Sequence, residues 1–500
     1  MEEKRLKDYL NLLTESGLLT ENNLGSSHEE KNVRYVSYNS MDVKPGTLFI
    51  CKGKAFKAQY LQDAIDKGAF CYVGETKIEG IEKDFPYILV NDIRTAMSEI
   101  GGLFYDEIWN KSLAMVGITG TKGKSTTATF VKAILDDYCR SLGEREAGFI
   151  SGIYTYDGRV KKKAHITTPE TLELHKMLSD CVENGCKYLV METSSQALKY
   201  GRTAALDYTV SAFLNISEDH ISDMEHPDFE DYFDSKLMIF RQSKIACVNM
   251  DMESERCERV LKAAKEHCQK VITFGSNVDS HDLVNVPETA DFYGYDIKAT
   301  SSKLEFKLKH QQQTEQITVN IGGKYNVSNA LAAVAIARAL DIPFKNIKSG
   351  LSKVKVAGRM ELYALSKKHV DVIVDYAHNK LSYQTLLENV RDLYPNKKIM
   401  LIAGCVGGKA QNRRQELADV INTYVDEAIL TEQYPGKEPV EKICAQIKAN
   451  IKKDKSIRVI VNRDKAVEEA CRQADDGWVI VAAGSDEDRD RVEAFIKNNE

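Results

Sequence analysis

SLAMVGITGTKGKSTTATFVKAIL, residues 112–135, contains an apolar strand, a turn punctuated by glycines and an amphipathic helix. We interpret Gly117, Gly120 and Gly123, followed by Lys124 and Ser125, as a P-loop of the general pattern G-x-x-x-x-G-K-[ST]. In such a loop the backbone N–H groups and the helix N-terminus surround nucleotide phosphates, the lysine neutralises their charge and the hydroxyl ligates magnesium. An ordinary glycine turn is the plainer interpretation, and the combination of residues disfavours it. The stretch therefore predicts a phosphate-binding site.

Composition excludes several classes of protein. The chain has 500 residues, 43% of them hydrophobic, and a formal net charge of −6. That length predicts several domains, and the acidic balance argues against a general nucleic-acid or membrane-surface binder. Because no signal sequence and no apolar run of about 18 residues is found, we expect a cytoplasmic protein without a membrane partner. Its 11 cysteines form no C-x-x-C pair, which favours reduced, buried thiols over zinc sites or disulfides.

Short apolar strands alternate with helices along the chain, which predicts an α/β fold with a doubly wound central sheet. We place domain boundaries so that residues 1–110, 111–355 and 356–500 form three domains. Ligands of doubly wound sheets bind at the carboxyl ends of the strands. There Glu192 ends a predicted strand at 188–192, and a polar cluster running from Asn215 to His220 follows one at 208–215. With Ser125 these residues could complete a magnesium shell, although a structurally satisfied carboxylate is the plainer interpretation of Glu192.

Lys236 occupies an unusual place in a helix predicted over residues 229–240. It lies on the apolar stripe formed by Phe229, Phe233, Leu237 and Phe240. One interpretation is a lysine whose stem packs while its ammonium reaches water. The other is a desolvated lysine whose pKa falls, so that the neutral amine can react with carbon dioxide. The resulting carbamate would be an anion able to ligate magnesium.

Together these segments resemble the Mur ligase family, and most closely its MurE branch, which adds an amino acid to a UDP-N-acetylmuramoyl-dipeptide in peptidoglycan synthesis. The resemblance covers essentially the whole chain. It implies a uridine-nucleotide-binding first domain, a central P-loop ATPase domain and a Rossmann-like third domain that supplies the amino acid. It is carried by eight segments in family order: 120–126, 167–169, 192–195, 215 with 219–220, 231–236, 326–329, 358–361 and 375–378.

The resemblance also implies a mechanism and a set of site residues. A substrate carboxylate attacks the γ-phosphate of ATP to form an acyl phosphate, which the amine of the amino acid then attacks. The implied catalytic residues are Lys124, Glu192, His220 and Lys236, and two Mg²⁺ ions would be held by Ser125, Glu192, His220 and carbamylated Lys236. ATP would contact Gly120, Thr121, Lys122, Gly123, Lys124, Ser125, Thr126, Asn326, Arg359, Asp375 and His378. The UDP-MurNAc-peptide and the amino acid would contact Ser40, Thr167, Thr168, Ser194, Arg202, Arg414 and Glu487.

Departures from the family pattern concentrate in the first and third domains. Asn39 and Met41 replace the Asp and Arg that flank Ser40 in the uridine motif, and Gln196 replaces a histidine. The D-N-P-R motif with which many relatives grip diaminopimelate is here residues 433–436, QYPG, and the nearby G-K-G-H-E retains only its glutamate. Because no arginine remains there for a bidentate carboxylate contact, we predict that the substrate is not diaminopimelate but L-lysine or another amine. Arg413 or Arg414 could bind its carboxylate.

Two other functions remain open at this point. One is a Mur-like ligase that joins a different acid and amine, as folylpolyglutamate synthases do. The other is a nucleotide-binding regulatory protein without turnover, which the joint presence of Lys124, Glu192, His220 and Lys236 disfavours. We expect a monomer that binds its small-molecule substrates and no nucleic acid.

Overall fold

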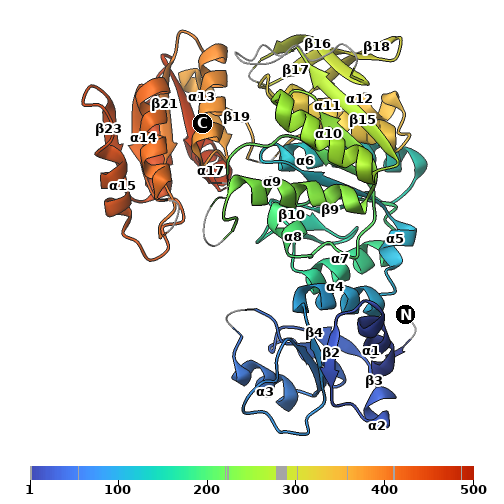
Figure 1. The fold of residues 1–500 in the computed structure, drawn as a ribbon. Coiled ribbons are helices and arrows are strands. Elements are labelled where there is room, and N and C mark those ends of the chain that lie inside the picture. The colour runs from blue at the N-terminus through green and yellow to red at the C-terminus, as the bar shows by residue number, and fades with distance from the viewer. Residues whose placement is uncertain are drawn as a thin grey trace. The chain divides into compact units, whose positions relative to one another are not determined.

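The computed structural model describes residues 3–53, 56–219, 221, 225–277, 290–300, 302–356, 358–408, 411–485 and 487–499 (Figure 1). These residues form two compact units. The first consists mainly of Met1–Gly275 and Ala332–Ile347, and the second mainly of Phe292–Leu331 and Lys348–Glu500. The division passes through helix α11 (Asn326–Ala339). No described helix is long and apolar enough to cross a membrane. The predicted domain boundaries after residues 110 and 355 stay a prediction.

The first unit begins with a small α/β layer. Its sheet has the strand order β2 (Leu19–Asn22), β7 (Tyr87–Val90), β6 (Ala69–Gly74), β5 (Thr47–Ile50) and β4 (Tyr35–Ser37). Its helices are α1 (Leu6–Glu15), α2 (Ser26–Glu29), α3 (Ala58–Asp66) and α4 (Ile93–Phe104), and β1 (Lys4–Arg5) pairs with β3 (Asn32–Val33). Leu6, Tyr9 and Leu13 of α1 are completely buried, as the spacing of an amphipathic helix requires.

The P-loop lies in the central sheet of the same unit. The strands that the first unit contributes to this sheet are, in spatial order, β11 (Lys161–Lys163), β10 (Tyr154–Tyr156), β9 (Gly148–Ile150), β12 (Tyr188–Glu192), β8 (Ala114–Thr119), β13 (Tyr208–Phe213), β14 (Ser243–Asn249) and β15 (Lys270–Ser276). The run from β9 to β15 is parallel. The carboxyl ends of β8, β12 and β13 therefore meet at one edge, where the sequence predicted a ligand site.

Helices cover both faces of this sheet. On one face an apolar cluster joins Met115 and Leu189 to residues of α7 (Thr171–Glu183), α8 (Ser195–Lys199), α9 (Phe229–Leu237) and α10 (Ser254–His267). Because strand side chains alternate, the buried Val116 and Val190 point to the opposite face. The remaining helices are α5 (Ile108–Ser112), α6 (Lys124–Leu142), which contacts β8 and β12, and α12 (Phe344–Lys353).

The second unit contains two sheet segments. An antiparallel segment comprises β16 (Phe292–Ala299), β17 (Leu304–His310) and β18 (Gln313–Val319), which the sequence analysis did not predict. A six-stranded sheet has the order β19 (Glu361–Leu365), β20 (Val370–Asp375), β24 (Trp478–Ala483), β21 (Lys398–Ala403), β22 (Glu427–Leu430) and β23 (Ser456–Val459). Only β19 is antiparallel in it. This alternation of parallel strands and helices is that of a Rossmann-like domain.

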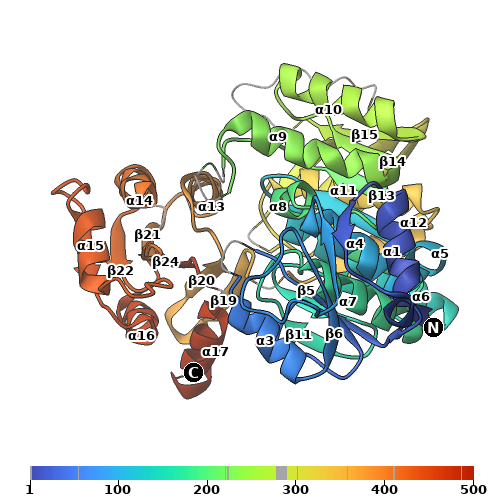
Figure 2. The same cartoon turned by 60° about the horizontal axis from the view of Figure 1, so that its bottom comes forward.

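The helices that follow β19 in the chain flank the six-stranded sheet (Figure 2). Helix α14 (Asn412–Tyr424) contacts both α13 (Lys380–Leu393) and α15 (Val440–Lys448), and α16 (Arg463–Gln473) contacts α17 (Asp488–Asn499). The apolar cluster under α16 and α17 includes the buried strand residues Val372 and Val374. The strand ends that face a ligand in such folds are those of β20, β21, β22 and β24.

Two predicted elements end earlier than the sequence suggested. The helix predicted over 229–240 ends at Leu237 and continues as a 3₁₀ helix over Met238–Gln242. The strand predicted over 208–215 ends at Phe213, because Asn215 turns across the P-loop and its carbonyl accepts from the Thr121 N–H at 3.0 Å. The prediction of mostly buried cysteines is confirmed, since only Cys268 of the 11 is partly exposed.

Candidate functional site

The loop between β8 and α6 is shaped to hold an anion. Gly120 and Gly123 have φ angles of +151° and +84°, which side-chain-bearing residues rarely adopt. A Cβ on Gly120 would lie 2.9 Å from Leu214 Cβ, so the backbone passes too close to its neighbour for any other residue. Gly123 is followed directly by α6, whose N-terminal N–H groups and dipole favour a phosphate. The loop geometry fits a nucleotide.

Gly117 has a different role from the one predicted. Five residues separate Gly117 from Gly123, one more than the general P-loop pattern allows. Gly117 lies inside β8, where a Cβ would approach Tyr208 Cε1 to 2.8 Å. It is therefore a packing residue beneath the tyrosine ring, and the loop proper begins at Gly120.

Lys124, Ser125 and Glu192 form the core of the candidate site. Lys124 Nζ donates to the carbonyls of Gly120 at 2.8 Å and Thr121 at 3.2 Å, so the ammonium lies within the loop. The Ser125 hydroxyl donates to Glu192 Oε2 at 3.0 Å, and Glu192 is only 2% exposed. A hydroxyl and a carboxylate are oxygen ligands of the kind that Mg²⁺ prefers. This donor set fits a magnesium ion beside the bound phosphates.

Asn215 and Asp219 fasten the loop to the end of β13. The Lys122 N–H donates to Asn215 Oδ1 at 2.8 Å, and Asn215 Nδ2 donates back to the Lys122 carbonyl at 3.1 Å. The Lys122 ammonium pairs with Asp219 at 2.9 Å. Thr121 and Thr126, the remaining predicted loop contacts, are both buried. The loop is therefore held in place by contacts within the protein itself.

Lys236 lies against the same loop. Its side chain is 2% exposed, and Nζ donates to the Gly120 carbonyl at 3.0 Å and lies 4.7 Å from the centre of the Tyr232 ring. Burial, assisted by the nearby Lys124 charge, lowers the pKa of Lys236 far below its usual value, against the opposing effect of Asp219. The interpretation of Lys236 as a snorkelling lysine is wrong, because its ammonium does not reach water.

His220 lies outside the described residues, so its predicted role in metal binding stays a prediction. Within the described residues, no group of three or more His, Cys, Asp or Glu side chains is placed to hold a metal ion. Among the predicted metal-binding residues that the structure describes, Ser125 and Glu192 are hydrogen-bonded to each other, and Lys236 donates to the Gly120 carbonyl of the neighbouring loop.

Most of the predicted contacts of the acidic substrate lie beside Glu192. Thr168 Oγ1 donates to the Glu192 carbonyl at 2.9 Å and accepts from the Ser194 N–H at 3.1 Å. Arg202 donates to the Thr168 carbonyl at 3.3 Å and pairs with Glu170 at 2.6 Å. The neighbouring Thr167 is half-buried, and Ser40 of the first layer is buried with its carbonyl bound by Lys67 at 2.7 Å.

Glu170 was missed from the sequence although it organises this cluster. It pairs with Lys52 as well as with Arg202. Burial raises the pKa of Glu170, but pairing with Lys52 and Arg202 holds it below its usual value. No local pattern marks these partners, because Lys52 and Glu170 are 118 residues apart.

In the second unit the structure brings together most of the remaining predicted ATP contacts. Asp375 is buried and accepts from the N–H groups of Met360 at 3.0 Å and Ala377 at 2.8 Å. Burial raises the pKa of Asp375, and the Arg359 guanidinium opposes that rise. His378 Nδ1 lies 2.9 Å from the Tyr376 carbonyl.

Asn326 stands at the start of α11. Its side-chain amide donates to the Gly322 carbonyl at 2.7 Å and accepts from Asn329 Nδ2 at 3.0 Å. The adjacent Tyr325 interacts electrostatically with Asp375 and Arg359, and burial raises its pKa. The predicted ATP contacts of this unit thus share one region.

The predicted amine contacts are placed differently. Arg414 is buried and pairs with Glu438 at 2.6 Å, whereas the neighbouring Arg413 is half-buried. Glu487 pairs with Arg491 at 3.1 Å. Gln433 Nε2 donates to the Gly484 carbonyl at 2.9 Å, which joins the two loops where the sequence departs from its relatives.

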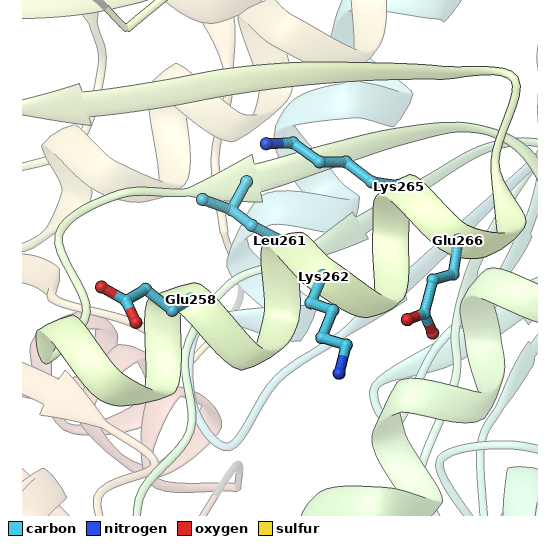
Figure 3. A pocket seen from close by; sticks show the side chains of 5 residues that line it. All are labelled: Glu258, Leu261, Lys262, Lys265 and Glu266. Carbon is cyan, nitrogen blue, oxygen red and sulfur yellow. The ribbon is translucent and has the colours of Figure 1, made fainter.

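A separate hollow of about 390 Å³ lies on the surface of α10 (Figure 3). It is lined by Glu258, Leu261, Lys262, Lys265 and Glu266, all from this one helix. None of them belongs to the P-loop or to the strand ends around it. Charged side chains of both signs on one exposed helix do not make a catalytic site, and we assign the hollow no function.

Comparison with known proteins shows the family to which this chain belongs. Residues 118–337 match the Mur ligase middle domain, and residues 358–486 match the glutamate ligase domain of Mur ligases. The chain is 35% identical over 459 residues to the UDP-N-acetylmuramoyl-L-alanyl-D-glutamate–L-lysine ligase of Streptococcus thermophilus, covering 90% of this chain and 88% of that protein. The enzyme of the same name from Enterococcus faecalis is 34% identical over 462 residues, covering 91% and 88%.

Solved structures agree on the fold. A UDP-N-acetylmuramoyl-L-alanyl-D-glutamate–2,6-diaminopimelate ligase superposes with a TM-score of 0.67 at 21% identity, covering 99% of both chains. MurF ligase from Thermotoga maritima, solved in complex with ADP, superposes with a TM-score of 0.60 at 18% identity, covering 93% of this chain and 97% of that chain.

The chain belongs to the Mur ligase family and has its three-domain α/β fold, as the sequence motifs predicted. It is therefore an ATP-dependent ligase that joins a carboxylate to an amine.

Proposed function

We propose that this ligase adds L-lysine to UDP-N-acetylmuramoyl-L-alanyl-D-glutamate in peptidoglycan synthesis. The observation that carries the proposal is the match over 90% of the chain to a ligase whose name specifies L-lysine. The QYPG segment at residues 433–436 supports it, because no arginine stands there to grip the second carboxylate of diaminopimelate.

The chemistry takes place in two steps. A carboxylate oxygen of the UDP-linked peptide attacks the γ-phosphorus of ATP, so that the γ-phosphate–ADP bond breaks and an acyl phosphate forms. The α-amine of lysine then attacks the acyl carbon, phosphate leaves with the C–O electron pair, and the surplus amine proton passes to solvent. Lys124 and the loop N–H groups hold the transferring phosphate and offset its charge. Most of the acceleration is positioning and charge stabilisation.

Magnesium would be held first by Ser125 and Glu192, and it would supply charge neutralisation that lets anionic reactants approach each other. We assign His220 and carbamylated Lys236 to a second ion. The carbamate forms when the neutral Lys236 amine attacks the carbon of carbon dioxide and loses one N–H proton. Burial of Lys236 keeps the amine available for that step, and the product is an anion beside the P-loop.

Other residues are assigned by the same proposal. ATP is bound additionally by Asn326, Arg359, Asp375 and His378. The UDP-linked substrate contacts Ser40, Thr167, Thr168, Ser194 and Arg202, and the amine contacts Arg414 or Arg413 together with Glu487. Since Glu438 already engages Arg414, substrate binding there would have to displace this ion pair. We further propose that the domains comprise residues 1–110, 111–355 and 356–500, and that the enzyme is cytoplasmic and monomeric.

A substrate panel tests the function. Purified protein, Mg²⁺ and ATP are combined with UDP-MurNAc-L-Ala-D-Glu and one amino acid at a time, and phosphate release and product mass are measured. We expect turnover with L-lysine and a kcat/KM at least about 100-fold lower with meso-diaminopimelate, because its second carboxylate lacks an arginine partner. Turnover with a folate and glutamate, but with no UDP-linked peptide, would support the alternative ligase instead. The absence of turnover with every pair of acid and amine would refute both functions.

A further inference from the structure

A chain of hydrogen bonds joins α8 to α9, which lie side by side in the first unit (Figures 1 and 2). The His226 ring is completely buried, with Nε2 2.9 Å from Ser195 Oγ and Nδ1 2.5 Å from Asp231 Oδ2. Lys199 of α8 donates to the same Asp231 oxygen at 2.6 Å. We refer to Ser195, His226 and Asp231 as the His226 chain. In such an order of hydroxyl, imidazole and carboxylate, the carboxylate fixes the tautomer and orientation of the imidazole.

The proton arrangement in the His226 chain follows from the acidity of Asp231. Burial raises the pKa of that carboxyl, but hydrogen bonds from Lys199 and His226 hold it below its usual value. Asp231 is therefore ionised at neutral pH and can only accept, so Nδ1 of His226 carries a hydrogen. In the neutral ring Nε2 then accepts from the Ser195 hydroxyl. With the ring neutral, the donor direction thus runs from Ser195 to Asp231.

The His226 chain does not have the arrangement of a hydrolase. Ser195 is 5% exposed and begins α8, so its Oγ bonds to an interior ring instead of facing solvent. The elements that the His226 chain connects are more informative than this resemblance to a catalytic triad. Ser195 follows Ser194 in the turn after β12, the strand that ends in Glu192.

The other end of the His226 chain leads to the P-loop. Tyr232 follows Asp231 in α9, its ring centre lies 5.2 Å from that of His226, and its hydroxyl donates to Thr121 Oγ1 at 3.1 Å. Lys236 lies one turn further along the same helix, with its ammonium 4.7 Å from the Tyr232 ring centre. A shift of the first turn of α9 would therefore move Lys236 relative to Gly120.

We propose that His226 and Asp231 are positioning residues that hold α9, and with it Lys236, in register with the P-loop and with the turn that follows Glu192. The inference rests on the proposed function, in which Lys236 acts as a carbamate. Imidazole–carboxylate pairs serve this purpose elsewhere because a fixed tautomer and two directed bonds leave the ring one orientation.

Asp231→Asn tests the inference, with Asp234→Asn as its matched control. Both aspartates lie on α9, but Asp234 is on the exposed side and pairs with Arg259 at 2.6 Å. An asparagine at 231 can donate to Nδ1, which would reverse the tautomer and turn Nε2 into a donor towards Ser195. We expect Asp231→Asn to lower kcat about ten-fold with the KM for ATP nearly unchanged, and Asp234→Asn to do neither.

A second measurement follows Lys236 directly. Protein equilibrated with ¹³C-bicarbonate should give a carbamate carbon signal that Lys236→Ala abolishes, and that signal should weaken in Asp231→Asn but not in Asp234→Asn. Asp231→Glu keeps the carboxylate and should recover part of both kcat and signal. Thermal unfolding of each variant checks whether the fold is intact. His226→Gln replaces Asp231→Asn as the test variant if Asp231→Asn does not fold.

The outcomes separate the two proposals. A wild-type protein with neither turnover nor carbamate signal would refute the proposed function and this inference with it. If the wild-type protein shows turnover or a carbamate signal, the inference is tested by the variants. It alone would be overturned if Asp231→Asn and His226→Gln matched Asp234→Asn in that property.

Discussion

At the scale of single residues, Lys236 shows most clearly how stability conflicts with the function that we propose for it. A buried amine is costly, and the structure leaves its ammonium one carbonyl partner, that of Gly120, among the described contacts. That carbonyl also accepts from Lys124 at 2.8 Å, so it would stay satisfied if Lys236 were removed. The residue therefore contributes little to the fold, which is the pattern expected of a residue kept for chemistry.

Lys236→Met should separate these effects. We expect unfolding at pH 7 to become harder by on the order of 1 kcal/mol, because a buried polar group is replaced by an apolar side chain of similar length. Ligase activity should fall at least about 100-fold. Short carboxylates such as acetate should restore part of the activity in Lys236→Ala, where there is room for them. Denaturant unfolding and steady-state kinetics measure both effects, and full activity in either variant would contradict the assigned role.

Ser125 gives a second prediction at this scale. Ser125→Ala removes the hydroxyl that bonds Glu192, and with it one of the two proposed oxygen ligands of magnesium. We expect the Mg²⁺ concentration for half-maximal activity to rise about ten-fold. Ser141→Ala, an exposed serine near the end of the same helix, is the control and should leave the magnesium dependence unchanged. An unaltered magnesium titration in Ser125→Ala would remove this ligand from the proposal.

At the scale of elements, α4 and α7 pack unusually closely. His175 of α7 is completely buried, its ring centre lies 4.7 Å from that of Trp109, and a Cβ on Gly101 of α4 would overlap its Nδ1. Glycine weakens a helix interior, and here it permits the close approach of the two helices. Burial lowers the pKa of His175 to about 3, so the ring is neutral in the folded protein at physiological pH.

This burial predicts a pH dependence of stability. Between pH 6.5 and about 3 the unfolded chain binds a proton at His175 that the folded chain does not, so the free energy of unfolding falls as the pH falls. His175→Phe should remove up to about 1.4 kcal/mol per pH unit from that slope. Urea unfolding between pH 7 and pH 5 measures it, and His165→Phe, at an exposed histidine, is the control. Equal slopes in wild type and His175→Phe would show that another group is responsible.

At the scale of the whole molecule, the proposed ATP contacts are divided between the two compact units. The P-loop belongs to the first unit, whereas Asn326, Arg359 and Asp375 belong to the second. Nucleotide binding should then depend on residues of both units.

Arg359→Ala tests that dependence. We expect the KM for ATP to rise about ten-fold, because a cation that would offset phosphate charge is lost while the P-loop is intact. Arg472→Ala is a suitable control, since that arginine is exposed and pairs only locally with Glu468. An ATP dependence identical to that of the wild type would restrict the nucleotide site to the first unit.

The local sequence was sufficient to predict features that depend on neighbouring residues. The strand at 188–192, the loop ending in Gly123 and Lys124, and the helix bearing Lys236 were all predicted, because periodicity and turn chemistry operate over a few residues. Eight motifs in order were enough to indicate the family, which the comparisons confirmed. The burial of Lys236 was open from the sequence, and the structure decided it.

Tertiary structure alone decided which distant side chains meet. Asn215 lies 93 residues from Lys122, and His226 lies 31 residues from Ser195, so no spacing rule could connect them. They meet because β8 lies between β12 and β13 in a parallel sheet, which brings the following turns to one edge. The sequence by itself thus determined the P-loop and the family, whereas sheet order decided how the loop is held and how Lys236 is placed against it.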